Sequence, residues 1–101
     1  MSFYADKTIW ITGASSGLGR SLAIALSREN ASLILSGRNI DRLNEVKELC
    51  EQSPSVNIIP LDLADQESIE NAFTQYGSVV GEVDILVNNA GNAHGLDPID
   101  K

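Results

Sequence analysis

The feature that most constrains this fold is a glycine-rich stretch, residues 12–19 (TGASSGLG), placed between two patterned segments. Before it, residues 8–12 (TIWIT) are β-branched or aromatic throughout, which predicts a strand buried on both faces, with Trp10 in the core. After it, apolar residues from Leu18 to Leu26 recur at helical spacing. A strand that enters a helix through such a turn can bind phosphate, because the first N–H groups of the helix are unpaired.

The three glycines of this turn have different predicted tasks. Gly13 allows the chain to turn sharply, Gly17 lets the backbone approach a diphosphate without an intervening Cβ, and Gly19 permits close packing of helix on strand. The diphosphate would rest on the N-terminus of the helix that begins near Leu18. The spacing G-x-x-x-G-x-G differs from the common G-x-G-x-x-G, and the lack of a Gly-Lys pair excludes an ATPase-type loop. The alternative is a tight turn without a ligand.

Strands and helices alternate along the rest of the chain. Further strands are predicted at residues 32–37, 56–61 and 84–88, and helices at residues 18–30, 39–50 and 65–77. Asn39 is expected to cap the second helix, and Asn30 and Gly77 to end the first and third. This alternation predicts an α/β fold, a Rossmann-type doubly wound parallel sheet of strand order 3-2-1-4 that stops after the fourth strand. Pro60 favours an edge position for the third strand.

Composition narrows the class of partner. The chain has 14 acidic and 7 basic residues and a formal charge of -7, which disfavours lasting contact with nucleic acid but allows a bound dinucleotide. Cys50 is the single cysteine, so we predict a small apolar filler on a helix, no metal site and a reducing, cytoplasmic setting. The sequence shows neither a basic leader nor an apolar run of roughly 18 residues, so we predict neither secretion nor membrane insertion.

A second motif, N-N-A-G at residues 88–91, follows the fourth predicted strand. Together with the turn T-G-x-x-x-G-x-G, it resembles the short-chain dehydrogenase/reductase family, and this resemblance covers the entire chain. It implies that Asn88 is chiefly structural, because an Asn at a buried strand end can lock the sheet by hydrogen bonding. It also implies that Asn89, Ala90 and Gly91 line the wall of a nicotinamide cofactor site.

The end of the second predicted strand indicates which cofactor is bound. NAD-binding relatives carry an acidic residue there that binds the ribose 2′-hydroxyl, whereas this chain has no carboxylate at residues 36–39. Arg38 can pair with a 2′-phosphate, and Ser15, Ser36 and Asn39 offer short hydrogen-bonding side chains nearby. We therefore predict NADP(H) rather than NAD(H). The alternative is that Arg38 is an exposed arginine paired with a nearby aspartate, either residue 41 or residue 62.

The end of the third predicted strand completes the expected site. The resemblance implies that the carboxylate of Asp62 accepts from the adenine amino group and that Leu63 makes a backbone contact. Alternatively, Asp62 only caps the following helix. The predicted cofactor-binding residues are Gly13, Ser15, Ser16, Gly17, Leu18, Gly19, Ser36, Arg38, Asn39, Asp62, Leu63, Asn89, Ala90 and Gly91.

No catalytic residue is predicted in this chain. The resemblance implies a catalytic Ser, Tyr and Lys, with the last two spaced Y-x-x-x-K, so that the cation lowers the pKa of the phenol. Tyr4 is followed four positions later by Thr8, and Tyr76 by Val80. We expect the chain to be the N-terminal, cofactor-binding segment of a longer single-domain enzyme, inactive alone, with its fourth strand as an unprotected edge that makes it marginally stable or prone to associate.

These observations favour one function over two others. The leading hypothesis is an NADP(H)-dependent oxidoreductase that transfers a hydride between nicotinamide and a small-molecule carbonyl or secondary alcohol, and the resemblance implies dimers or tetramers at full length. A noncatalytic nucleotide-binding or redox-sensing module is the alternative. A methyltransferase is disfavoured, because Arg38 replaces the acidic residue that binds ribose hydroxyls. His94, the single histidine, is interpreted as an incidental loop residue.

Overall fold

The computed structural model describes residues 3–15, 17–62 and 64–89. Strands and helices alternate as predicted, apart from one short additional helix. The strands are β1 (Thr8–Thr12), β2 (Ser32–Gly37), β3 (Val56–Pro60) and β4 (Ile85–Asn88). The helices are α1 (Gly17–Ser27), α2 (Ile40–Leu49), α3 (Gln66–Gln75) and the short α4 (Gly77–Val80).

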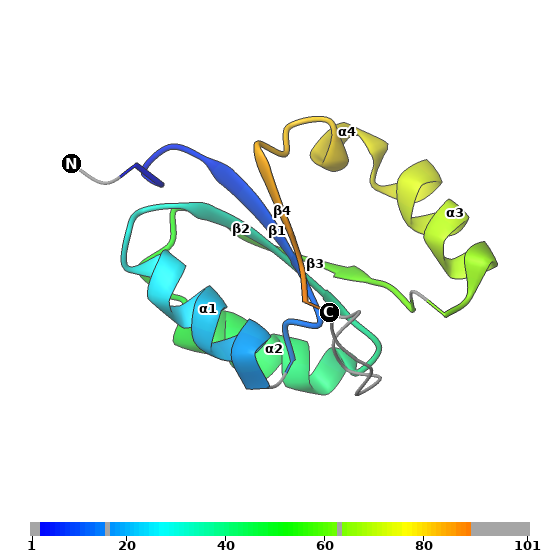
Figure 1. Ribbon diagram of the computed structural model, residues 1–101, viewed down its shortest axis with the longest axis horizontal. Helices are drawn as coiled ribbons and strands as arrows, with labels where there is room; N and C mark the ends of the chain where they lie inside the picture. Colours follow the sequence, from blue (N-terminus) through cyan, green and yellow to red (C-terminus); the bar gives the residue numbers. More distant parts are fainter. Residues whose placement is uncertain (1–2, 16, 63, 90–101) are drawn as a thin grey trace, which may run out of the picture.

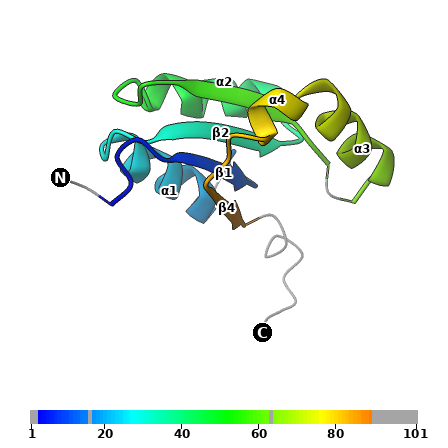
Figure 2. The ribbon, with the colours of Figure 1, turned by 90° about the horizontal axis from the view of Figure 1, so that it is seen from above.

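The four strands form one parallel sheet in the order β3-β2-β1-β4. Figure 2 shows this order across the sheet, with β1 and β2 in the middle. Ile11 of β1 lies in register with Leu35 of β2 on one side and with Val87 of β4 on the other. The predicted fold class and strand order are confirmed, and β3, which ends at Pro60, lies at one edge of this sheet.

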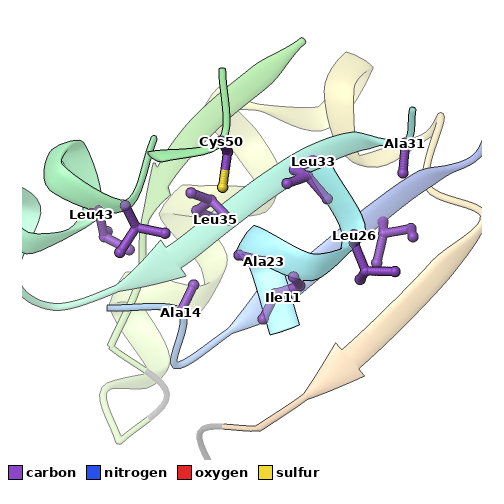
Figure 3. Close-up of a cluster of buried hydrophobic side chains, with 11 residues drawn as sticks. Ile11, Ala14, Ala23, Leu26, Ala31, Leu33, Leu35, Leu43 and Cys50 are labelled. Carbon is purple, nitrogen blue, oxygen red and sulfur yellow. The ribbon is translucent and has the colours of Figure 1, made fainter. Parts of the chain in front are cut away.

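Helices cover both faces of the sheet. Figure 1 shows α1 and α2 on one face and α3 with α4 on the other. The larger apolar cluster lies between the sheet and the first two helices, where Ile11, Leu35 and Leu43 are fully buried (Figure 3). The second cluster is centred on Trp10 and Ile34 and is covered by residues of α3 and α4. Trp10 is therefore a core residue, as predicted.

Side-chain caps set the starts of two helices. Asn39 accepts a hydrogen bond from the backbone N–H of Arg42 at the start of α2, 3.1 Å away, as its cap position predicts. Asp65 does the same at the start of α3, where it accepts from the N–H of Glu67 at 3.0 Å. Both helices begin where the sequence predicts. No helix in the described part of the chain combines the length and apolarity that crossing a bilayer requires.

Two predicted helix ends differ from the structure. Asn30 does adopt the left-handed conformation, with φ of 65°, but α1 ends at Ser27 and a turn of three residues follows. Gly77 is not the terminator of α3: the helix ends at Gln75, and Gly77 begins α4 without a positive φ. The physical reason is packing, because the half-buried Val79 and Val80 lie against the Trp10 cluster and favour another helical turn.

Candidate functional site

The carboxyl ends of the strands bring the predicted site residues to one edge of the sheet. Because all strand pairs are parallel, the glycine turn after β1, Arg38 after β2, Asp62 after β3 and Asn89 after β4 leave the sheet at the same edge (Figure 1). This edge is where open parallel α/β sheets bind ligands, beside the strand at which the direction of winding changes. Here that strand is β1, which lies between β2 and β4.

The glycine turn has the geometry that its sequence predicts. Gly13 and Gly17 are left-handed, with φ of 65° and 58°. A Cβ built on Gly17 would have no heavy atom within 4 Å, so the backbone at the first residue of α1 is open to an approaching group. A Cβ on Gly19 would instead overlap the carbonyl group of Gly13. The turn therefore leaves the N-terminus of an eleven-residue helix accessible, which suits a diphosphate.

Hydrogen bonds from two other strand ends hold this turn in place. The N–H of Ala14 donates to the carbonyl oxygen of Ser36 at the end of β2, 3.0 Å away. The side-chain amide of Asn89, just after β4, donates to the carbonyl oxygen of Gly13 at 3.3 Å. Both bonds join segments that are distant in sequence, so the shape of the phosphate-binding turn depends on the assembled sheet.

A buried hydroxyl joins β1 to β4 beside the turn. Thr12, which is 4% exposed, donates from Oγ1 to Oδ1 of Asn88 across 3.0 Å, and Oγ1 also lies 3.4 Å from the carbonyl oxygen of Val87. Asn88 thus has the structural role expected of it, although its partner is a threonine hydroxyl rather than backbone alone. This hydrogen bond links Asn88, the last residue of β4, to Thr12, the last residue of β1.

Arg38 is exposed at the end of β2. Its guanidinium group has no hydrogen bond or ion pair with any residue in the described ranges, so the alternative pairing with Asp41 or Asp62 is not observed there. Arg38, Asn39 and Asp41 line a shallow, open depression at the surface. Asn39 already uses its side-chain oxygen to cap α2, which leaves its amide nitrogen for a ligand.

Two serines predicted to line the cofactor site lie in different environments. Ser15 is half-buried, and its hydroxyl lies 3.6 Å from the position of a Cβ on Gly37, next to the end of β2. Ser36 has no exposed surface, and its hydroxyl accepts a hydrogen bond from Nε1 of Trp10 across 2.8 Å. The hydroxyl of Ser36 is therefore placed in the core, and its predicted contact with a cofactor gains no support from this position.

Asp62 lies in a turn rather than at a helix cap. Its Oδ1 accepts from the N–H of Ala64 at 3.0 Å, and its own N–H donates to the hydroxyl of Ser68 at 2.9 Å. Because the cap of α3 is Asp65, the alternative that Asp62 caps this helix is not observed. Asp62 remains half-buried at the rim, where its proposed contact with adenine stays a prediction.

Sequence reasoning missed three side-chain groups whose hydrogen bonds hold the strand ends and the turn at Asp62. These are the indole N–H of Trp10, the hydroxyl of Thr12 and the hydroxyl of Ser68. Only Trp10 carried a usable signal, because a buried indole N–H needs an acceptor. Five residues discussed above lie outside the described part of the chain, namely Ser16, Leu63, Ala90, Gly91 and His94. Among the described residues, no group of three or more His, Cys, Asp or Glu side chains could hold a metal ion.

The chain matches the family model for short chain dehydrogenases over residues 7–100. SDR family member 7, a dehydrogenase/reductase of Mus musculus, is 41% identical over 93 residues, which cover 87% of this chain and 28% of that protein. An NADP-dependent 3-hydroxy acid dehydrogenase of Schizosaccharomyces pombe is 36% identical over 102 residues, which cover 98% of this chain and 39% of that protein. The chain thus spans well under half the length of these relatives.

Solved structures agree with the observed fold. An NADPH-dependent reductase involved in bacilysin biosynthesis superposes with a TM-score of 0.73 at 33% identity, covering 84% of this chain and 37% of that one. An alcohol dehydrogenase from the archaeon Thermococcus sibiricus, complexed with 5-hydroxy-NADP, gives a TM-score of 0.71 at 36% identity, covering 79% and 35%. Both likenesses show that the chain shares its fold with solved oxidoreductase structures.

Proposed function

Because this chain belongs to the short-chain dehydrogenase/reductase family, we propose that it is the cofactor-binding segment of an NADP(H)-dependent oxidoreductase. The parent enzyme would transfer a hydride between the cofactor and a small molecule that carries a carbonyl or a secondary hydroxyl group. When bound, the nicotinamide supplies or accepts that hydride. The residues of this chain have the task of gripping and orienting the cofactor.

The glycine turn and the start of α1 are the proposed diphosphate site. Gly17 offers an unobstructed backbone. The unpaired N–H groups of the first turn of α1 can donate to a diphosphate, whose negative charge is favourable at a helix N-terminus. Leu18 adds an apolar side chain that is 68% exposed beside this turn, and a bound nucleotide would cover it. Asn89 holds the turn from behind through the carbonyl oxygen of Gly13.

The proposed adenine and ribose contacts lie on either side of this turn. Asp62 uses one carboxylate oxygen on Ala64 and offers the other to the adenine amino group, with a backbone contact at Leu63 beside it. On the nicotinamide side we place Asn89, Ala90 and Gly91, of which the small residues Ala90 and Gly91 leave room beside the ribose. Ser15 and Ser16 stay in the proposal as members of the phosphate turn.

The observation that carries the choice of NADP(H) is the position of Arg38. This arginine is exposed at the end of β2, has no partner among the described residues, and follows a strand end without any carboxylate. A planar guanidinium can bind a 2′-phosphate through two parallel hydrogen bonds, whereas an NAD site needs an acceptor for the 2′-hydroxyl. An NADP-dependent relative and a solved structure complexed with 5-hydroxy-NADP support the same choice.

We propose that the 101-residue chain binds the cofactor without turning it over. Neither tyrosine has a lysine four positions later, and Tyr76 packs against the Trp10 cluster instead of standing at the rim. Proton transfer to the substrate oxygen needs a phenol whose pKa is lowered by a nearby cation. A chain that binds NADPH while the complete protein reduces no carbonyl compound would instead support the noncatalytic nucleotide-binding module.

The cofactor assignment is tested by titrating NADPH and NADH while following nicotinamide fluorescence. We expect tighter binding of NADPH, and Arg38→Asp should lower its affinity by roughly tenfold to a hundredfold, because a charge-assisted pair is lost. Arg28→Asp is the matched control, since it changes the charge equally at the other end of α1, away from the glycine turn. Tighter binding of NADH, or unchanged NADPH affinity in Arg38→Asp, would contradict the assignment.

A further inference from the structure

We infer that Trp10 and Ser36 form a positioning pair that holds the end of β2 so that Arg38 can select a 2′-phosphate. This inference rests on the proposed function and deepens it, because it assigns specificity to a hydrogen bond between two core residues. The hydrogen bond from the indole Nε1 to the serine hydroxyl, with 2.8 Å between the atoms, is the observation that carries it.

The pair lies in the interior of the sheet. Trp10 is 5% exposed and Ser36 has no exposed surface. In the sheet register Trp10 is opposite Ile34, so its indole reaches along β2 toward the carboxyl edge to find Ser36. The indole fills the core here and contacts the ring of Phe73, with 5.9 Å between the ring centroids. The indole adds a polar donor, and a buried donor of this kind is stable only with an acceptor.

Two hydrogen bonds hold Ser36, and another holds Gly37, the next residue. Its hydroxyl binds Trp10, and its carbonyl oxygen accepts from the N–H of Ala14 in the glycine turn. The carbonyl oxygen of Gly37 accepts from the N–H of Leu61, 3.1 Å away. Arg38 is the first residue beyond these anchors, and its side chain is exposed. The anchors therefore fix where the guanidinium leaves the sheet relative to the glycine turn.

This arrangement makes a prediction that differs from a purely structural role. Removing one partner leaves a buried polar group unsatisfied and lowers stability, whereas removing both partners relieves that penalty. The preference for the 2′-phosphate should not follow stability in this way, because it depends on the Trp10–Ser36 hydrogen bond itself. The variant that lacks both partners should be free of this penalty and still lack the hydrogen bond that positions Arg38.

The test compares Trp10→Phe, Ser36→Ala and the double variant, all in the full 101-residue chain. Calorimetry measures binding of adenosine 2′,5′-bisphosphate and of 5′-AMP, and urea unfolding followed by circular dichroism measures stability. We expect each single variant to lower the ratio of the two affinities by about tenfold, with 5′-AMP binding unchanged. The double variant should lose less stability than the sum of the two single losses, because no polar group is left unpaired, but it should not recover the ratio.

Several outcomes would overturn the inference. A ratio that stays at the wild-type value in all variants, or that recovers with stability in the double variant, leaves the pair with a structural role only. If Trp10→Phe does not fold, Ser36→Ala carries the test, because it removes a single oxygen atom. If the wild-type chain itself shows no preference for the 2′-phosphate and Arg38→Asp changes nothing, the proposed function has failed and this inference fails with it.

Discussion

Asn89 donates from its side-chain amide to the carbonyl oxygen of Gly13, 3.3 Å away, and so fastens the end of β4 to the glycine turn. Gly19 lies directly against this bond: a Cβ there would be 2.9 Å from the amide nitrogen of Asn89 and would overlap the carbonyl of Gly13. The carbonyl of Gly13 is a backbone group that cannot rotate away. The close approach of α1 to β1 therefore requires glycine at this position.

We expect Gly19→Ala to destabilise the chain by about 1–3 kcal/mol, because inserting a methyl group forces the helix away from the turn. The shifted turn should also weaken nucleotide binding. Urea unfolding followed by Trp10 fluorescence measures the stability. Gly77→Ala is the control, since a Cβ at Gly77 has no heavy atom within 4 Å and its φ is not positive. Equal effects of the two substitutions would contradict this account.

We expect the hydroxyl of Thr12 to contribute to the free energy of unfolding through its hydrogen bond to Asn88. Thr12→Val removes the bond to Asn88 and leaves that side-chain oxygen without its donor, so we expect a loss of about 1 kcal/mol in the free energy of unfolding. Thr12→Ser keeps the hydroxyl and should preserve the link between β1 and β4. Hydrogen exchange at the end of β4 would show the difference, and slower exchange in Thr12→Val than in Thr12→Ser would count against it.

Asn30 provides a test of backbone conformation. Its φ of 65° lies in the left-handed region, which glycine enters freely and which costs residues with a Cβ about 1 kcal/mol. Asn30→Ala should therefore lower stability by about that amount, because alanine lacks the polar side chain that makes this conformation tolerable for asparagine. Asn30→Gly should leave stability nearly unchanged. Thermal unfolding of the two variants is the measurement, and the opposite order would refute the explanation.

Cys50 should make stability depend on pH in the alkaline range. Burial raises the pKa of its thiol above the ordinary value of 9.0, and a hydrogen bond with the side chain of Ser27 offsets part of this shift. The unfolded chain therefore loses this proton at a lower pH than the folded chain does. The contribution to stability is complete below the unfolded-state pKa and is lost as the pH rises through the folded-state pKa.

Above the pKa that the Cys50 thiol has in the unfolded chain, we expect the free energy of unfolding to fall more steeply with pH in the wild-type chain than in Cys50→Ala. The substitution also removes buried volume, so the slope with pH rather than the absolute stability is the quantity to compare. Parallel urea titrations between neutral and alkaline pH provide it. Identical slopes in the two proteins would show that the buried thiol does not contribute.

Most of the fold could be predicted from local patterns. The spacing of apolar residues in β1 and β2 and the cap at Asn39 are signals that act within a few residues, and the structure confirms each of them. The end of α3 was predicted less well. Glycine is a common helix terminator, yet the packing of the half-buried Val79 against the Trp10 cluster favours the further turn α4 after Gly77. That packing is a tertiary contact and leaves no local signal.

The candidate site was also predictable from the sequence only in part. The positions of the glycine turn, Arg38 and Asp62 at strand ends follow from the order of elements, because parallel strands deliver their carboxyl ends to one edge. The core placement of the Ser36 hydroxyl does not follow from that order. It depends on which side of β2 faces Trp10, and on how far the indole reaches along the strand.

By itself, the sequence determined the alternation of strands and helices, the glycine turn and the arginine that follows β2. Periodicity and turn chemistry encode these features over short distances. Only the tertiary structure decided which side chains hold that turn and strand end. The Trp10–Ser36 bond joins residues 26 positions apart and the Asn89–Gly13 bond residues 76 apart. Such bonds form only after the sheet sets its register, because no local pattern specifies which distant donor will meet which acceptor.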